Sequence, residues 1–66
     1  MTLRINGEAR QFPAALSIAA LIETLALAGK RIAVERNGEI VPKSRHAEVM
    51  AEDGDALEIV VAVGGG

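Results

Sequence analysis

The sequence has no cysteine, no tryptophan and no tyrosine, and Phe12 is its only aromatic residue. Without cysteine there is no disulfide, no thiolate metal ligand and no thiol nucleophile. Without aromatic side chains there is no platform on which nucleic-acid bases stack. The net charge of -2 also lacks the clustered basic excess that nucleic acids and anionic membranes require. We therefore expect no nucleic acid and no membrane among the partners.

What is present is mainly aliphatic, since half of the 66 residues are hydrophobic. This length fits one domain, which we place at residues 1–63, followed by residues 64–66 as a flexible glycine tail. The longest apolar run is too short for a membrane span. The first residues alternate in polarity and do not form the basic and apolar regions of a signal peptide. We expect a cytoplasmic protein with an aliphatic core.

Two Asn-Gly pairs predict two β-hairpins. Asn6-Gly7 follows an alternating segment, and Asn37-Gly38 lies between the strand-like segments 32–36 and 39–41. A two-residue type I′ turn needs positive φ at both central residues, and asparagine and glycine accept that conformation. The return strand of the first hairpin is expected at 8–12.

Between the hairpins the apolar period changes from two to that of a helix, with one face formed by Ile18, Leu21, Ile22 and Leu25. Ser17 precedes this run as a plausible N-cap. Gly29 is expected to end the helix in the left-handed conformation, which gives a helix of about three turns. Residues 43–50 show no clear period and predict an irregular link or a short helical turn.

Asp53-Gly54-Asp55 predicts a tight turn into a last strand, in which Leu57, Ile59 and Val61 share one face and Val60 and Ala62 the other. The order is then hairpin, helix, hairpin, link and strand, which predicts an α+β domain with one main helix on one face of a mixed sheet of about five strands. Parallel pairing of the first and last strands at the centre would make this a β-grasp fold, as in ubiquitin.

No set of residues in the sequence suggests catalysis or metal binding by the chain itself. His46 is the only histidine, and with no second histidine or cysteine we interpret it as a surface residue. The two aspartates around Gly54 lack the further ligands of a calcium loop, so a turn is the better interpretation. Acidic residues gather before and in the last strand, which suggests an acidic rim that steers association with basic partners: Glu48, Glu52, Asp53, Asp55 and Glu58.

The sequence closes on Gly64-Gly65-Gly66, directly after an apolar strand. Taken alone, this stretch is more typical of a frayed terminus than of a site. Glycine has no Cβ, however, so such a tail can extend fully and pass through a narrow slot, and its last carbonyl carbon is unhindered.

Taken together, the motifs resemble those of the thiamine-pathway sulfur carrier proteins, the ThiS family, which is related to the small subunit of molybdopterin synthase. The resemblance covers essentially the whole chain. It rests on the segments Val34-Glu35-Arg36-Asn37-Gly38-Glu39-Ile40-Val41-Pro42, Asp53-Gly54-Asp55, Glu58-Ile59-Val60 and Val63-Gly64-Gly65-Gly66, with Arg45-His46 shortly after the first.

This resemblance implies that the C-terminal carboxylate, on Gly66 of the Gly65-Gly66 pair, carries sulfur as a thiocarboxylate. An E1-like adenylyltransferase would activate it with MgATP, and a cysteine desulfurase or related persulfide protein would supply the sulfur. Thiazole synthase would then use the thiocarboxylate for the thiazole ring of thiamine. The carrier binds no cofactor or metal of its own and is not an enzyme, and Gly64 adds reach to the tail.

We expect Val60, Ala62 and Val63 to help form a patch on which partners dock. Two alternatives stay open at this point. The chain could instead resemble the molybdopterin synthase small subunit in function, delivering the same thiocarboxylate sulfur to a pterin. It could also be a ubiquitin-like module that only binds, although its few basic residues and single aromatic argue against RNA as the ligand.

Overall fold

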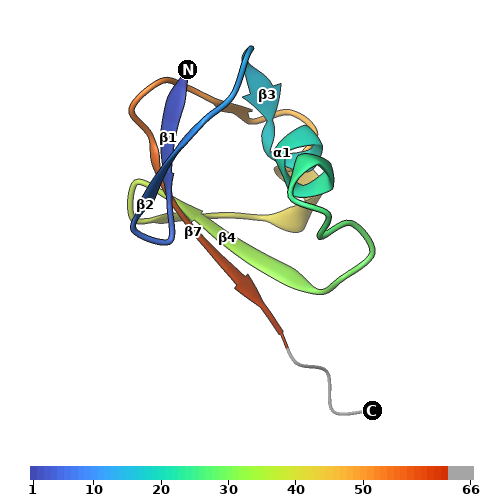
Figure 1. Cartoon of the computed structure of the whole chain (residues 1–66). Helices are drawn as coiled ribbons and strands as arrows, with labels where there is room; N and C mark the ends of the chain where they lie inside the picture. The colour runs from blue at the N-terminus through green and yellow to red at the C-terminus, as the bar shows by residue number, and fades with distance from the viewer. Residues whose placement is uncertain (63–66) are drawn as a thin grey trace.

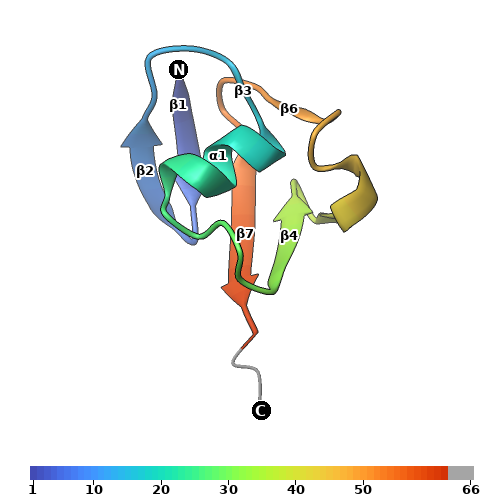
Figure 2. The ribbon, with the colours of Figure 1, turned by 90° about the vertical axis from the view of Figure 1, so that its right-hand side faces the viewer.

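The computed structural model describes residues 1–62 (Figure 1). Its elements in chain order are β1 (Thr2–Ile5), β2 (Glu8–Gln11), β3 (Leu16–Ser17), α1 (Ile18–Thr24), β4 (Ile32–Arg36), β5 (Glu39–Val41), the 3-10 helix η1 (Lys43–Arg45), β6 (Met50–Ala51) and β7 (Ala56–Val61). Five strands form one mixed sheet in the order β2-β1-β7-β4-β5. Helix α1 lies across one face of this sheet, in front of β7 in Figure 2. The predicted α+β architecture is confirmed.

The first and last strands pair in parallel at the centre of the sheet, as the sequence predicted. Arg4 is in register with Ala56 and Ile5 with Leu57, whereas β7 runs antiparallel to β4 on its other side. Both Asn-Gly pairs form the expected turns between antiparallel strands, with φ of 51° at each asparagine. β7 is therefore the strand against which both hairpins are assembled.

Helix α1 begins as predicted. The backbone N–H of Ala20 donates to Ser17 Oγ at 3.0 Å, and Ser17 has extended backbone angles, as an N-cap residue does. The apolar face then points to the sheet, with Ile18 and Leu21 fully buried. This burial, more than helix propensity, holds a helix of only seven residues in place.

The predicted end of the helix is wrong. The helix ends at Thr24, not before Gly29, and the residue that turns the chain is Ala26 at φ 61°. Leu27 N–H donates to Ile22 O at 3.0 Å and Ala26 N–H to Glu23 O at 2.9 Å, which is the hydrogen-bond pattern of a Schellman motif. Gly29 does have positive φ, but it lies in the loop beyond.

The core lies between α1 and the sheet and is almost wholly aliphatic. Its buried members come from the helix, from four strands of the large sheet, from β6 and from the chain after β2: Leu3, Ile5, Phe12, Ile18, Leu21, Ile22, Val34, Val41, Ala51, Leu57 and Ile59. In β1 and β7 alternate residues enter this core and the residues between them are exposed. The period-2 pattern of the sequence therefore identified the buried face of both central strands correctly.

Two features of the 43–51 segment were not predicted correctly. β6 pairs with β3 in a separate two-stranded sheet, which is too short to leave a period in the sequence. His46, expected on the surface, is buried with 8% of its area exposed. Its Nε2 lies 3.1 Å from the carbonyl oxygen of Val41, and this contact connects the segment after η1 to the end of β5. One polar residue inside an irregular link gave no sequence signal for burial.

Candidate functional site

The end of β7 is the part of the structure that leads to the glycine stretch. Strand β4 accompanies β7 to its last residue, with Ile32 in register with Val61 and Ala33 with Val60. Beyond the strand, Ala62 N–H still donates to Arg31 O at 2.9 Å. On this edge of β7, hydrogen bonds to β4 and to the residue before it therefore hold the chain in place up to Ala62.

On its other edge β7 is braced by a side chain. Strand β1 pairs with β7 only as far as Leu57, after which the first hairpin turns away. Asn6, in that turn, then occupies the place of a strand residue: Ile59 N–H donates to Asn6 Oδ1 at 2.7 Å and Asn6 Nδ2 donates to Ile59 O at 3.0 Å. The sequence identified Asn6 as a turn residue, and nothing in its spacing predicted this second role.

The residues at the end of β7 are exposed. Val60 has 60% of its area exposed and Ala62 is exposed as well, as predicted. Val61 was expected on the buried face with Leu57 and Ile59, but 38% of its area is exposed, because α1 ends before it covers this part of the strand. Val63, the predicted tail residue Gly64 and the predicted sulfur-carrying pair Gly65-Gly66 lie outside the described residues.

The start of β7 is fixed by a buried carboxylate. Asp55 Oδ2 accepts hydrogen bonds from Arg36 Nε at 2.7 Å and Glu52 N–H at 2.8 Å, and Oδ1 accepts one from Asn37 Nδ2 at 3.1 Å. Burial by itself raises the pKa of Asp55, but these hydrogen bonds outweigh it and hold the pKa below its usual value. In turn, the hydrogen bond to Asp55 raises the pKa of Arg36. This cluster joins the turn before β7 to the second hairpin.

The predicted acidic rim is therefore smaller than the sequence indicated. Asp55 is used internally, Glu52 Oε2 lies 3.7 Å from Arg36 Nη2, and Glu48 Oε2 lies 3.5 Å from Arg45 Nε. Neighbouring cations thus offset part of this negative charge. Glu58 in β7 takes part in none of the ion pairs that the described residues form.

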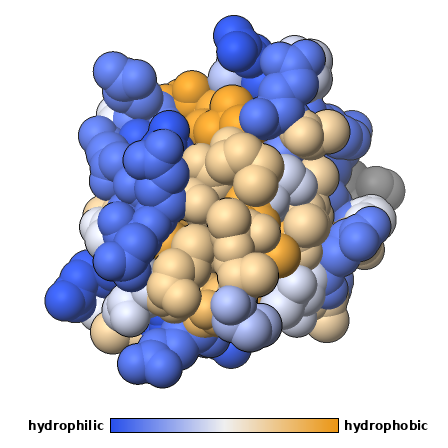
Figure 3. All heavy atoms as spheres, turned by 90° about the horizontal axis from the view of Figure 1, so that it is seen from above, coloured by the Kyte–Doolittle hydropathy of each residue, from blue (hydrophilic) through white to orange (hydrophobic). Residues whose placement is uncertain are grey.

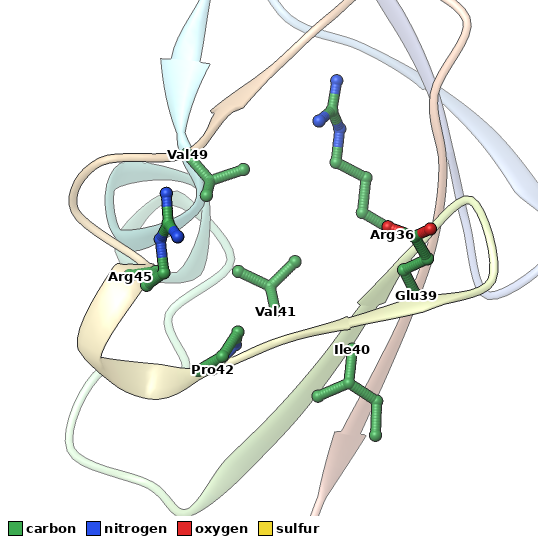
Figure 4. A pocket seen from close by; sticks show the side chains of 7 residues that line it. All are labelled: Arg36, Glu39, Ile40, Val41, Pro42, Arg45 and Val49. Atoms are coloured by element: carbon green, nitrogen blue, oxygen red, sulfur yellow. The ribbon is translucent and has the colours of Figure 1, made fainter.

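Two surface hollows lie near the second hairpin and the helix. The first, of about 200 Å³, is approached by the arginine side chains of β4 and η1 from two sides (Figure 4). Both of these arginines are ion-paired to carboxylates of the chain, Arg36 to Asp55 and Arg45 to Glu48. The second, of about 400 Å³, lies between the end of α1, the loop before β4 and η1, and is lined by Lys30, Arg31 and Lys43 beside apolar residues.

Within residues 1–62 no group of three or more His, Cys, Asp or Glu side chains is placed to hold a metal ion. The same residues include no helix that is long and apolar enough to cross a membrane. Figure 3 shows a third feature, an apolar area framed by hydrophilic residues at the end of the molecule opposite to the exit of β7. β6, which carries the exposed Met50, lies at this end (Figure 2).

Comparison with known proteins identifies the family. The model of the ThiS family matches residues 3–66, which is nearly the whole chain. The chain belongs to the ThiS family. The crystal structure of the thiamine biosynthesis protein ThiS from Geobacter metallireducens superposes with a TM-score of 0.85 at 30% identity, and each chain covers 100% of the other. This likeness confirms the predicted β-grasp fold.

Curated relatives include both free-standing and longer proteins. Sulfur carrier protein ThiS of Bacillus subtilis is 48% identical over 46 residues, which are 70% of each chain. A protein of Paramagnetospirillum magneticum named thiazole synthase is 53% identical over all 66 residues. The chain spans only 20% of the length of the first two curated relatives that it matches. In these relatives a ThiS-like segment is part of a much longer chain.

Proposed function

We propose that this ThiS-family chain is a sulfur carrier of thiamine biosynthesis and that the carboxylate of Gly66 is the group that takes up the sulfur. The match of the family model through residue 66, which includes the glycine stretch, carries the proposal. The name of the Bacillus subtilis relative supports the sulfur-carrier role, and the name of the Paramagnetospirillum magneticum relative supports thiazole synthase as the acceptor.

The proposed reaction starts from the carboxylate of Gly66, which is a poor electrophile until it is activated. A carboxylate oxygen of Gly66 attacks the α-phosphorus of MgATP on an E1-like adenylyltransferase, pyrophosphate leaves, and an acyl-adenylate forms. The terminal sulfur of a persulfide, supplied by a cysteine desulfurase or related protein, then attacks the acyl carbon and AMP leaves. A second thiol attacks the donor's cysteine sulfur in the resulting acyl disulfide, forms a disulfide with it and releases the thiocarboxylate. Thiazole synthase takes the sulfur from it.

The chain's own residues provide access to the reacting carbon, not catalysis. Gly66 provides an acyl carbon without a neighbouring side chain. Because Gly64 and Gly65 have no side chains either, the tail is thin enough to enter a narrow channel of a partner enzyme. Val60, Ala62 and Val63 are proposed to contact the partner close to the exit of β7. The base, the metal ion and the nucleophile belong to the partner enzymes, so the chain acts as their protein substrate.

Intact-mass analysis tests this proposal. The chain is incubated with MgATP, the E1-like adenylyltransferase, a persulfide donor and a thiol, and is expected to gain the mass of one oxygen-to-sulfur exchange located on Gly66. The same measurement on protein from its native source shows whether Gly66 is the last residue of the mature protein. Absence of the exchange in the complete mixture, or further residues after Gly66 that are never removed, would falsify the proposal.

Deletion of Gly65 and Gly66 gives a sharper comparison. The deletion moves the terminal carboxylate back by two residues, or about 7 Å, and is expected to abolish sulfur loading. Because the buried core lies between Leu3 and Ile59, we expect the midpoint of thermal unfolding to stay unchanged. Gly64→Ala keeps the chain length and both terminal glycines, so it should lose less sulfur loading than the deletion does.

A further inference from the structure

Strand β2 forms one edge of the large sheet, with β1 on one side only. In Figure 2 no ribbon lies beyond β2 on the side away from β1. All four residues of the strand are exposed: Glu8, Ala9, Arg10 and Gln11. An open edge strand presents backbone N–H and C=O groups on which a strand of another chain can assemble. The side chains of β2 therefore decide which strand fits there.

The hydrogen bonds of the first hairpin show which backbone groups face the open edge. Phe12 N–H donates to Met1 O at 2.9 Å and the Met1 amino group donates to Phe12 O at 2.6 Å, so these residues form a hydrogen-bonded pair. Because such pairs alternate along antiparallel strands, Arg10 occupies the next one, and Ala9 and Gln11 lie at the positions between. The N–H and C=O groups of Ala9 therefore point away from β1, toward the open edge.

The two side chains next to Ala9 carry opposite charges and lie on the same face. Glu8 is in register with Ile5 and Arg10 with Leu3, and both of these β1 residues are buried on the side of the helix. Neither Glu8 nor Arg10 takes part in the ion pairs that residues 1–62 form. The edge thus carries an acid and a base, two residues apart, that are not neutralised by the described part of their own chain.

A second copy of the chain complements this edge in one register. When two β2 strands pair antiparallel about a two-fold axis at Ala9, Glu8 of each copy lies directly opposite Arg10 of the other. The N–H and C=O groups of the two Ala9 residues then bond to each other across the axis. An axis at Arg10 would instead place the two arginines opposite each other, which is destabilising. The charges therefore select the register centred on Ala9.

The other edge of the sheet does not offer such a fit. Strand β5 has only three residues and is followed by Pro42, which has no N–H to donate. A two-fold axis at its central residue, Ile40, would place Glu39 opposite Val41, with no cation to meet the carboxylate. Self-complementary charge is therefore a property of β2 and not of both edges.

We propose that β2 is a homodimer interface, in which two copies of this chain pair antiparallel about Ala9 and join their five-stranded sheets into one. The two-fold axis is perpendicular to the sheet, so both copies of α1 lie on the same face and the two β7 strands run in opposite directions. The ends of β7 are then far apart and stay accessible to other proteins. This inference does not depend on the proposed sulfur-carrier function.

The interface is small, so the association is weak. A single pair of short strands buries less surface than stable dimers do, and we expect a dissociation constant of about 0.1–1 mM. Sedimentation equilibrium of the whole chain at low salt, at concentrations up to the millimolar range, should therefore show a monomer–dimer equilibrium. High salt should weaken it, because it screens the ion pairs between Glu8 and Arg10.

Charge reversal tests the register. Glu8→Arg and Arg10→Glu each place like charges opposite each other and should weaken self-association about tenfold or more. The two variants mixed in equal amounts should associate again, because each supplies the charge that the other lacks. Glu23→Arg and Arg31→Glu are the matched controls. These residues are exposed beside the second hollow, away from β2, and their reversal should leave the dimer unchanged.

A backbone readout distinguishes strand pairing from another contact between copies. The NMR signal of the Ala9 amide should shift as the protein concentration rises, because this N–H becomes hydrogen-bonded in the dimer, whereas that of Ala33 in β4 should not. Ala9→Pro removes the donor at an edge position and should give a monomer. Wild type that stays monomeric at millimolar concentration would overturn the proposal. So would a dimer that both charge reversals leave unchanged, whether or not Ala9→Pro folds.

Discussion

At Ala26 a side chain occupies a backbone conformation that favours glycine. Its φ of 61° is in the left-handed region, which costs a residue with a Cβ atom about 1–2 kcal/mol. The two hydrogen bonds of the Schellman motif and the burial of Ile22 and Leu27 around it hold Ala26 in this conformation. The helix thus ends where packing of Leu27 requires it to end, five residues before Gly29.

Ala26→Gly is expected to stabilise the protein. Relief of the left-handed strain is opposed by the larger backbone entropy of glycine in the unfolded chain, about 0.5–1 kcal/mol. The net gain in the free energy of unfolding should be about 0.5–1 kcal/mol, measured by urea denaturation. Ala28→Gly is the control, because Ala28 is exposed and its φ is not positive, and it should give no gain. Equal effects of the two substitutions would contradict the strain at Ala26.

Other single residues show which roles a sequence reveals. Ser17 and the asparagines of the two turns were identified because capping and positive φ depend on the residue and its immediate neighbours. The brace from Asn6 to Ile59 joins residues 53 positions apart, and the burial of His46 depends on the end of β5. Neither has a local signal, so neither could be predicted.

Among the elements, β7 depends most on the rest of the chain. At its start, Asp55 is tied to Arg36 and Asn37 of the second hairpin, and along its length β4 and Asn6 provide hydrogen bonds. The sequence predicted a turn at Asp53-Gly54-Asp55 but not that Asp55 is a buried anchor. The pairing of Asp55 with Arg36 depends on the register between β4 and β7, which only the folded sheet defines.

The Asp55 cluster predicts loss of stability in acid. The folded state holds the pKa of Asp55 below its unfolded value, so the carboxylate contributes stability that is fully present above that unfolded value, about 3.8. This contribution is lost as the pH falls through the lower pKa of the folded state. The free energy of unfolding of wild type, measured with urea at steps from pH 7 downward, should therefore decrease below about pH 4.

Asp55→Asn tests the origin of this decrease. Asparagine keeps an acceptor oxygen but not the charge, so the variant should be less stable at neutral pH and lose less stability on acidification. Arg36→Gln should flatten the pH dependence in the same way, because it removes the cation of the pair. If Asp55→Asn keeps the full pH dependence of wild type, other carboxylates cause it.

On the scale of the whole molecule, a small aliphatic core leaves little margin of stability. At the usual range per residue, a chain of 66 residues has a free energy of unfolding of roughly 3–10 kcal/mol. The side chains of Leu3, Leu21 and Leu57 are fully buried and bring β1, α1 and β7 together in one core. The presentation of the glycine stretch therefore depends on a few aliphatic contacts.

Leu57→Ala should unfold a large fraction of the protein. Truncation of a buried leucine costs about 2–5 kcal/mol, which is a major share of the whole. Val60→Ala, three residues along the same strand but 60% exposed, should change stability by less than about 0.5 kcal/mol. Circular dichroism during urea denaturation measures both, and similar losses for the two would show that the assigned faces of β7 are wrong.

The sequence by itself determined the elements and their order, because turn chemistry, capping and hydrophobic period act over a few residues. These local rules placed both hairpins, the start of α1, the buried face of β7 and, with the family motifs, the fold. Only the tertiary structure decided which segments distant in the sequence contact each other. These contacts determine the end of the helix at Ala26, the anchoring of Asp55, the burial of His46 and the position of Glu35 opposite Glu58. The physical reason is that these features depend on register and packing between segments far apart in the chain, which local residue preferences do not define.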